Sequence, residues 1–397
     1  MKKRITVLYL SHQVFYWSAV GGVVSFAAAY LPVRGFSAAD VGWILFGAMA
    51  LSFALQPLLA SYADRVGGQI LFRLLTGMSL FCAAMFLIAR FFVTSRPLFA
   101  LLYLLGVMSL DMQVPLLNSL SVYYSSRGVS FNYGLARGFG GFGFALATLG
   151  YGFLMEAWGE EWMPVAAVLC LLPALVILAL YPRLDAAGEA RSLPQQTSSL
   201  LTFIRRYKWY CFSLFGILFL AMFHAMVENY LIEVVSRFGG DSSHVGKALF
   251  IATVTELPMM SFFLPIWKRL GSRRILMVSA FAYIAKAVML IAASSLTAIY
   301  LIQPIQCISY VFLSTVQVYY ARESTDEADM VKGQSMITAF YTLGCALGNL
   351  TGGILISSFG VNTMLYAGLA MTLAGLAVFV LTLRRAMSVS APVRADV

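Results

Sequence analysis

The chain of 397 residues is 60% hydrophobic and only 11% charged, whereas a soluble domain averages about 45–50% apolar and about 25% charged residues. Apolar runs long enough to cross a hydrocarbon core of about 30 Å recur almost from end to end. The composition therefore excludes a soluble globular protein. A membrane barrel would need alternating segments of about ten residues, which the sequence lacks, so we predict a polytopic helical membrane protein.

The chain begins with "MKKR" and continues into an apolar run over residues 6–31. This run exceeds the roughly 7–15 apolar residues of a secretory signal, and no clear A-x-A cleavage site follows it. We interpret it as the first membrane helix, retained in the protein.

Charged residues and turn residues then divide the chain into about twelve predicted helices. Their expected limits are 6–31, 39–60, 70–93, 97–122, 131–155, 162–182, 208–235, 243–265, 274–294, 297–319, 332–357 and 361–383. The predicted fold is an all-α membrane protein with twelve transmembrane helices.

The longest polar interval, "YPRLDAAGEARSLPQQTSSLLTFIRRYK", separates six helices from six. Its Ser, Gln and Pro content is typical of a linker. We predict an N-terminal six-helix bundle over residues 1–182, a cytoplasmic linker over 183–207, a C-terminal six-helix bundle over 208–385, and a cytoplasmic tail over 386–397.

The two halves share a glycine pattern. Three glycines of the fifth helix match three of the eleventh at a constant offset of 201 residues: Gly143, Gly152 and Gly159 against Gly344, Gly353 and Gly360. The loops "DRVGG" and "KRLGS" match at an offset of 204 residues. A duplicated six-helix unit is typical of transporters, so the two bundles are expected to be pseudo-symmetric.

Lysine and arginine predict the orientation. Placing the N-terminus in the cytoplasm leaves only Arg34, Arg90, Arg96, Arg237 and Lys247 on the outer side. This follows the positive-inside rule and puts both termini in the cytoplasm, in a cell (inner) membrane. The net charge of +10 is then explained without a nucleic-acid partner.

Six ionisable residues lie deep within the apolar segments: Asp111, Arg137, His224, Glu228, Glu256 and Lys286. A charge at the bilayer centre costs at least about 2.5–3.5 kcal/mol, so it usually faces a partner or a water-filled cavity. One interpretation is that they form buried pairs holding helices together. Their presence in both halves favours the second interpretation, in which they line a central hydrophilic cavity.

The depths of these residues suggest pairs. Glu256 lies roughly 13 Å and Lys286 roughly 18 Å from the cytoplasmic face on consecutive helices, which allows an ion pair. His224 and Glu228 are four residues apart and therefore neighbours on one helix face.

Depth also relates charges of the fourth and fifth helices. Arg137 lies roughly 9 Å and Asp111 roughly 16 Å deep, with Asn118 shallower, and a guanidinium is long enough to bridge the gap. Phe144 follows Arg137 by two helical turns on the same face. The aromatic side chain is suited to stacking on a sugar or a base, although packing or a position at the lipid interface explains most of the aromatic residues.

The segment "FNYGLARGFGGFGFAL" (residues 131–146) resembles the fifth helix of the lactose permease group of the major facilitator superfamily. These proteins are proton symporters for oligosaccharides, nucleosides and aromatic acids. "YLPVRGFSAADVGWI" and "FALQPLLASYADRVGG" are similar to the family's first external loop, second helix and cytoplasmic loop. The resemblance extends over nearly the whole chain and implies the same two-bundle fold.

The resemblance also implies roles for single residues. Arg137 stands at the family's sugar-binding arginine, and Phe144 at its stacking tryptophan. Glu256 stands at the glutamate that joins substrate binding to proton coupling, and Lys286 at the arginine near the proton site. Glu228 lies close to an aspartate of the seventh helix.

Other positions depart from the family. Asn118 or Ser119 replaces the glutamate that pairs with the arginine, Gln306 stands at the family's histidine, and Ser309 at its proton-carrying glutamate. The proton relay of lactose permease is therefore not intact. The candidate proton-coupling residues are Glu256, Lys286, Asp111, Glu228 and His224, and the candidate substrate-binding residues are Arg137, Phe144, Asn118, Glu256 and Gln306.

These observations predict a secondary active transporter that takes up a small polar solute, such as a sugar or nucleoside, with protons by alternating access. Asp64, Arg65 and Gly67 would form its conformational gate. Its expected partners are the solute, protons and the lipid bilayer, and we expect a monomer. The alternatives are a proton-coupled efflux antiporter for drugs or metabolites and a non-transporting membrane sensor.

An enzyme is not expected. His12, His224 and His244 form no recognisable cluster in the sequence, and no nucleophile motif or Walker loop is present. The five cysteines lack metal-site spacing, and no metal or cofactor is predicted.

Overall fold

The computed structural model describes residues 2–66, 68–125, 127–129, 133–183, 199–326 and 329–386. The helices of the first half are α1 Lys2–Val23, α2 Ala27–Tyr30, η1 Leu31–Arg34, α3 Ala38–Val66, α4 Gly68–Phe92, α5 Arg96–Ser125, α6 Tyr133–Trp158, η2 Glu160–Trp162 and α7 Met163–Leu180. Those of the second half are α8 Leu200–Arg206, α9 Lys208–Asn229, α10 Leu231–Ser236, α11 Ser242–Ser261, α12 Phe263–Ala292, α13 Leu296–Ile302, η3 Gln303–Ile305, α14 Gln306–Ser324, α15 Met330–Phe359 and α16 Val361–Ala386.

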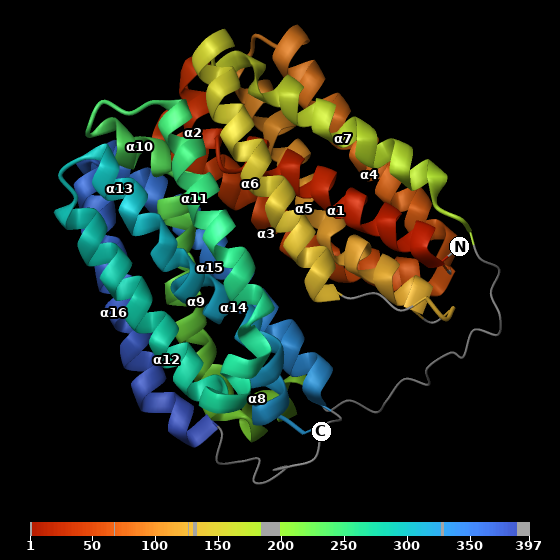
Figure 1. Cartoon of the computed structure of the whole chain (residues 1–397), viewed down its shortest axis with the longest axis vertical. Helices are drawn as coiled ribbons and strands as arrows, with labels where there is room; N and C mark the ends of the chain where they lie inside the picture. The colour runs from red at the N-terminus through yellow and green to blue at the C-terminus, as the bar shows by residue number, and fades with distance from the viewer. Residues whose placement is uncertain are drawn as a thin grey trace.

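The helices form two bundles, one from each half of the chain (Figure 1). Within the described residues, 11 helical stretches are long and apolar enough to cross a membrane. α11 corresponds to the eighth predicted span, over residues 243–265, and completes the twelve. It is less apolar because it carries serines, threonines, His244, Lys247 and Glu256, and it packs against α6 and α14. The all-α, twelve-helix prediction is confirmed.

Several predicted spans prove to be interrupted. The first span stops at Val23 and resumes as α2 and η1, where Pro32 occupies the start of the 3-10 turn. The seventh breaks at Tyr230, whose φ of −109° and ψ of 26° are not helical. The tenth is interrupted by η3, which contains Pro304. Proline, which lacks the backbone donor that a continuous helix needs, lies at the break of the tenth span, whereas the gaps after Val23 and at Tyr230 contain no proline. Periodicity alone indicated none of these breaks.

The predicted linker contains a short helix, α8, at residues 200–206. The rest of the linker from residue 184 to 198, and the predicted tail from 387 onward, lie outside the described residues.

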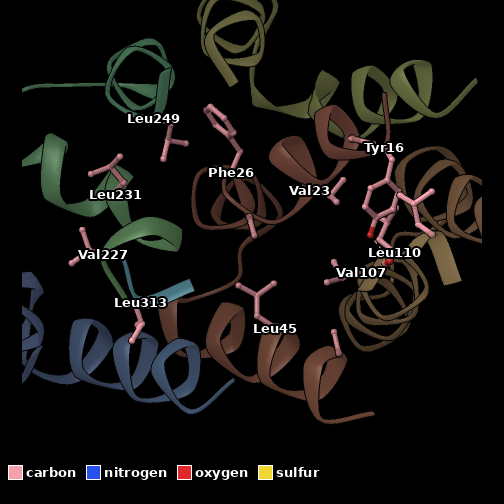
Figure 2. Packing of buried hydrophobic residues seen from close by; sticks show 14 of the residues in the cluster. Tyr16, Val23, Phe26, Leu45, Val107, Leu110, Val227, Leu231, Leu249 and Leu313 are labelled. Carbon is pink, nitrogen blue, oxygen red and sulfur yellow. Dashed lines mark hydrogen bonds between the residues drawn. The ribbon is translucent and has the colours of Figure 1, made fainter. Parts of the chain in front are cut away.

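Aromatic hydroxyls tie helices together inside the bundles. Tyr16 of α1 donates to the carbonyl oxygen of Leu110 in α5 at 2.7 Å, and Figure 2 shows its ring beside that helix. Tyr103 of α5 donates to the carbonyl oxygen of Val23 at 2.6 Å. A buried hydroxyl without such an acceptor would cost about 1–3 kcal/mol, so these bonds fix how α1 lies on α5.

Glycine allows equivalent helix crossings in the two bundles. A Cβ added at Gly143 of α6 would lie 2.5 Å from the carbonyl oxygen of Val14 in α1. One added at Gly344 of α15 would lie 2.5 Å from the carbonyl oxygen of Leu218 in α9. Each pair joins the fifth and first helices of its own bundle. Glycines that are 201 residues apart in the sequence therefore make the same helix contact, one in each bundle.

The next glycine pair joins the bundles to each other. Gly152 of α6 lies against Ser242 and Gly246 of α11, where an added Cβ would lie 2.8 Å from the carbonyl oxygen of Ser242. Gly353 of α15 lies against the carbonyl oxygen of Ala38 in α3. Both contacts lie at the end of the molecule opposite to the start of α1 and the end of α16 (Figure 1).

Hydrogen bonds reinforce this closed end. Tyr230, at the break after α9, donates to the carbonyl oxygen of Asn349 at 2.8 Å and approaches that of Ala38 at 3.4 Å. The backbone amide of Ala39 donates to Ser357 Oγ at 2.8 Å. At this end, hydrogen bonds between side chains of the second bundle and the main chain of α3 thus join the two bundles.

Replacing Gly143 by alanine should destabilise the protein, because the added methyl group would collide with the backbone of α1. Overpacking of this kind costs about 1–3 kcal/mol. Gly150 is a matched control in the same helix, because nothing lies within 4 Å of a Cβ added there. Thermal unfolding in detergent should show a lower Tm for G143A and an equal or higher Tm for G150A. Equal Tm values for G143A and the unmodified protein would contradict the tight crossing.

A capping box starts α11 at the closed end. Asp241 Oδ1 accepts from the backbone amides of Ser243 at 3.0 Å and His244 at 3.2 Å, and it lies 2.6 Å from His244 Nδ1. Partial burial opposes ionisation of Asp241, but the hydrogen bonds from His244 and Ser243 outweigh it and lower its pKa from 3.8 to about 2. The ionised cap therefore stabilises the folded state.

The stabilisation by Asp241 should depend on pH. Because the folded-state pKa lies below the unfolded value, the contribution is complete above about pH 4 and is lost as the pH falls toward 2. Asp241→Ala should cost about 1 kcal/mol at pH 7. Scanning calorimetry of both proteins should show a Tm difference that shrinks between pH 4 and 2. A difference that stays constant over this range would exclude the ionised cap as its cause.

Candidate functional site

A buried polar network lies where α11, α12 and α14 meet. Lys286 Nζ of α12 donates to Gln306 Oε1 of α14 at 2.5 Å. Gln306 Nε2 in turn donates to Glu256 Oε1 of α11 at 3.0 Å. All three residues are almost inaccessible, with 3%, 5% and 5% of their surfaces exposed for Lys286, Glu256 and Gln306 respectively. An acid and a base are therefore joined through one amide.

This arrangement corrects the predicted direct pair of Glu256 and Lys286. The side chain of Gln306 separates them, because α14 packs against both α11 and α12 and Gln306 is its first residue. A primary amide both accepts and donates hydrogen bonds, so it satisfies the amine with its oxygen and the acid with its nitrogen.

A second pair lies on α9. His224 Nε2 and Glu228 Oε2 are 2.9 Å apart, which confirms the predicted neighbours on one helix face. The His224 ring stacks on Tyr310 of α14, with centroids 4.5 Å apart and planes at 11°. Tyr310 lies one turn after Gln306, and Lys286 interacts electrostatically with Glu228. The two groups therefore form one polar cluster within the second bundle.

The first bundle contributes Arg137 of α6. Its guanidinium carbon lies 4.3 Å from the centre of the Trp17 ring in α1. Phe144, which lies two turns after Arg137 on α6 and was predicted as a stacking ring, lies beside Gly21 of α1. Trp17 takes the position beside the arginine because Gly140 lets the indole lie directly against α6.

A chain of hydrogen bonds along α1 holds this indole. Trp17 Nε1 donates to Gln13 Oε1 at 3.0 Å, and Gln13 Nε2 donates to the Tyr9 hydroxyl at 3.0 Å. The Tyr9 hydroxyl donates to the carbonyl oxygen of Leu117 in α5 at 3.3 Å. This chain of hydrogen bonds was not predicted from the sequence. Its signal was the spacing of Tyr9, Gln13 and Trp17, which are four residues apart along an apolar helix.

Asp111 and Asn118 lie on α5. Asp111 interacts with Ser52 of α3, and its Oδ2 is a buried atom with no hydrogen-bond partner among the described residues. Tyr16 lies within electrostatic reach of both Asp111 and Arg137. Asn118 is half-buried two turns further along α5. Asp111, Arg137 and Phe144 therefore all lie close to residues of α1.

The two groups face each other across the bundles. Arg137 interacts electrostatically with Glu256 and Tyr310 of the second bundle. Asp64 and Arg65 lie in the last turn of α3, but their side chains, and Gly67 as a whole, lie outside the described residues. The structure thus places Arg137 of the first bundle near Glu256 of the second. The predicted gate lies outside the side chains that the structure describes.

Two bundles of six helices that enclose charged residues from both halves define a membrane transporter of the major facilitator type. The sequence profile of the MFS_1 like family matches residues 6–367, and the chain belongs to this family. It is 25% identical to the maltose permease of Geobacillus stearothermophilus over 390 residues, which cover 96% of this chain and 95% of that protein.

Solved structures show the same fold at low sequence identity. The nucleoside transporter NupG matches with a TM-score of 0.76 at 14% identity, covering 96% of this chain and 98% of that one. A bacterial homologue of the human lysosomal transporter Spinster, in an inward-facing and unoccupied conformation, matches with a TM-score of 0.73 at 13% identity, covering 99% of both chains. The POT family transporter PepTSo matches with a TM-score of 0.70 at 13% identity, covering 98% of this chain and 99% of that one.

Replacing Gln306 by leucine should destabilise the protein. The leucine keeps the volume between α11 and α12 but offers neither donor nor acceptor, so Lys286 and Glu256 each lose a buried partner. Such a loss costs about 1–3 kcal/mol. Gln317→Leu, in a half-buried position of the same helix, controls for lost polarity. We expect Q306L to lower the Tm more than Q317L, and equal shifts would show that the amide bridge is not stabilising.

Proposed function

We propose that this protein is a proton-coupled symporter that takes up a small polar solute of the sugar or nucleoside class. The observation that carries the proposal is the buried acid–amide–amine arrangement of Glu256, Gln306 and Lys286, facing Arg137 of the other bundle. The similarity to a maltose permease supports a sugar. The structural similarity to a nucleoside transporter shows that this fold can carry such transport.

The solute would bind between the bundles. Arg137 supplies hydrogen-bond donors, and Trp17 keeps its guanidinium in place. Glu256 and Gln306 would receive the solute from the opposite side. Hydroxyl-rich solutes need donors and acceptors at once, and a guanidinium facing a carboxylate and an amide provides both. Phe144 and Asn118 are the remaining candidates for solute contacts.

Proton coupling would follow from burial. Burying a carboxyl group away from water costs little when the group is protonated and neutral, or when a nearby cation compensates its negative charge. Glu256 has both possibilities, because Gln306 links it to Lys286 and Arg137 lies within electrostatic reach. Protonation would remove the negative charge of Glu256, which lowers the cost of keeping this side chain away from water while the bundles reorient around the bound solute. Glu228 with His224, and Asp111, are further candidate carriers.

Alternating access would use the contacts between the bundles. The contacts of α6 with α11 and of α3 with α15 close the end opposite to the chain termini. With both termini in the cytoplasm of a cell membrane, as the positive-inside rule indicates, this state is closed to the outside. Opening that end would separate Gly152 from Gly246 and Tyr230 from Ala38. Asp64, Arg65 and Gly67 would then hold the cytoplasmic end closed, and one chain would suffice for the cycle.

Replacing Glu256 by glutamine should uncouple transport. The neutral amide has no proton to gain or lose, so uphill uptake driven by a pH gradient should fall to background. Solute exchange without a gradient should remain at least in part, because that step needs no net proton transfer. Reconstituted vesicles measure both, and an initial screen of sugars and nucleosides by thermal shift would identify the solute.

Glu156→Gln is the matched control, because Glu156 is an exposed carboxylate near the end of α6. It should leave both activities unchanged. Undiminished uphill uptake by E256Q would remove Glu256 from the mechanism. Solute export driven by an inward proton gradient would instead establish the efflux antiporter.

A further inference from the structure

A second polar site lies on the second bundle, far from the residues described above. A pocket of about 260 Å³ opens between the junction of α8 with α9 and the end of α16. Its walls include Arg206, Tyr207, Lys208, Trp209 and Arg385. Tyr210 and Ala386 complete the lining. Its three charged side chains are all cationic, so the pocket is suited to an anion.

The indole of Trp209 holds two of the cations together. The Arg385 guanidinium carbon lies 4.5 Å, and the Lys208 ammonium 5.8 Å, from the centre of its ring. Arg206 pairs with Asp326 and is partly neutralised. No ion pair involves Lys208 among the described residues. Lys208 and Arg385 both line the pocket and lie against the Trp209 ring, one on each of the two helices that meet there.

The start of α9 adds to the positive potential. The helix begins at Lys208, and the preceding Tyr207 provides no side-chain cap for its first amides. The first turn of a helix carries a partial positive charge and unpaired donors. The partial positive charge of this helix end therefore adds to the attraction that Lys208 and Arg385 exert on an anion.

An apolar surface begins next to the pocket. Phe212 contacts Trp209, with ring centroids 6.2 Å apart, and is 56% exposed. Leu381 is 69% exposed and lies one turn before Arg385 on the same face of α16. In a transmembrane bundle, such side chains face the acyl chains of the lipid.

We propose that this pocket binds the phosphate headgroup of an anionic phospholipid in the leaflet at the α8 end of the molecule. Arg385 and Lys208 would donate charge-assisted hydrogen bonds to the phosphate oxygens. The acyl chains would lie along Phe212 and Leu381. A soluble phosphate would use the cations alone, whereas a phospholipid uses both the cations and the adjoining apolar strip.

The bound lipid would connect the first and last helices of the second bundle. α9 and α16 pack against each other along the bundle, and the headgroup would bridge Lys208 of one to Arg385 of the other. A ligand that binds only the folded protein raises its stability in proportion to occupancy. The lipid would thus stabilise this bundle at the end where the two bundles are not joined by the glycine contacts.

The test uses the full chain purified in detergent. Dioleoyl phosphatidylglycerol, dioleoyl phosphatidylcholine and inorganic phosphate are added separately, and Tm is followed by intrinsic fluorescence. Native mass spectrometry counts bound lipid independently of stability. The double variant K208Q/R385Q removes the proposed contacts. The control K268Q/R274Q removes two exposed cations at the same end of the bundle but outside the pocket.

Phosphatidylglycerol should raise the Tm of the unmodified protein and of the control, and phosphatidylcholine should not. K208Q/R385Q should bind phosphatidylglycerol about thirtyfold more weakly, because two basic residues are removed and each contributes about 1 kcal/mol near a membrane surface. Equal losses in both double variants would show that only net charge matters and would overturn the proposal. An equal shift from inorganic phosphate would identify a free-anion site and reject the lipid.

Discussion

Close backbone contact at glycine determines how this molecule is assembled. Gly143 and Gly344 let the fifth and first helices of each bundle cross at backbone distance, and Gly152 and Gly353 allow the same between bundles. Helices in a membrane gain little from the hydrophobic effect when they meet, so association depends on packing and on small residues. Every other feature rests on this: the closed end exists because two bundles meet there, and the polar residues face each other because the crossings orient their helices.

The polar cluster in the second bundle depends on a different kind of interaction, the pairing of buried charges. Charged side chains at mid-depth are costly unless they have partners, and the second bundle supplies partners through one side chain, Gln306, which serves both Lys286 and Glu256. The first bundle supports Arg137 differently, with an aromatic ring whose own donor is tied back along α1. One side of the site is thus a hydrogen-bonded group of acids and bases, and the other is a guanidinium on a fixed platform.

The two ends of the molecule differ in what holds them. At one end, glycine crossings and the Tyr230 hydroxyl join the bundles directly. At the other, basic residues cluster at the start of α9 and the end of α16, beside exposed apolar side chains. For a transporter that works by relative movement of its bundles, the first kind of contact must break in each cycle. The second lies within one bundle and can persist throughout.

The sequence by itself determined the membrane class, the number of spans and the duplicated glycines, because these depend on transfer energies and on residue types, which are local properties. It also predicted the His224–Glu228 neighbours, since both lie on one helix. Only the tertiary structure decided that Gln306 separates Glu256 from Lys286, that Trp17 lies beside Arg137, and that the seventh span breaks at Tyr230. Which side chain enters the space between two helices depends on their rotation and tilt, and packing against all their neighbours sets both.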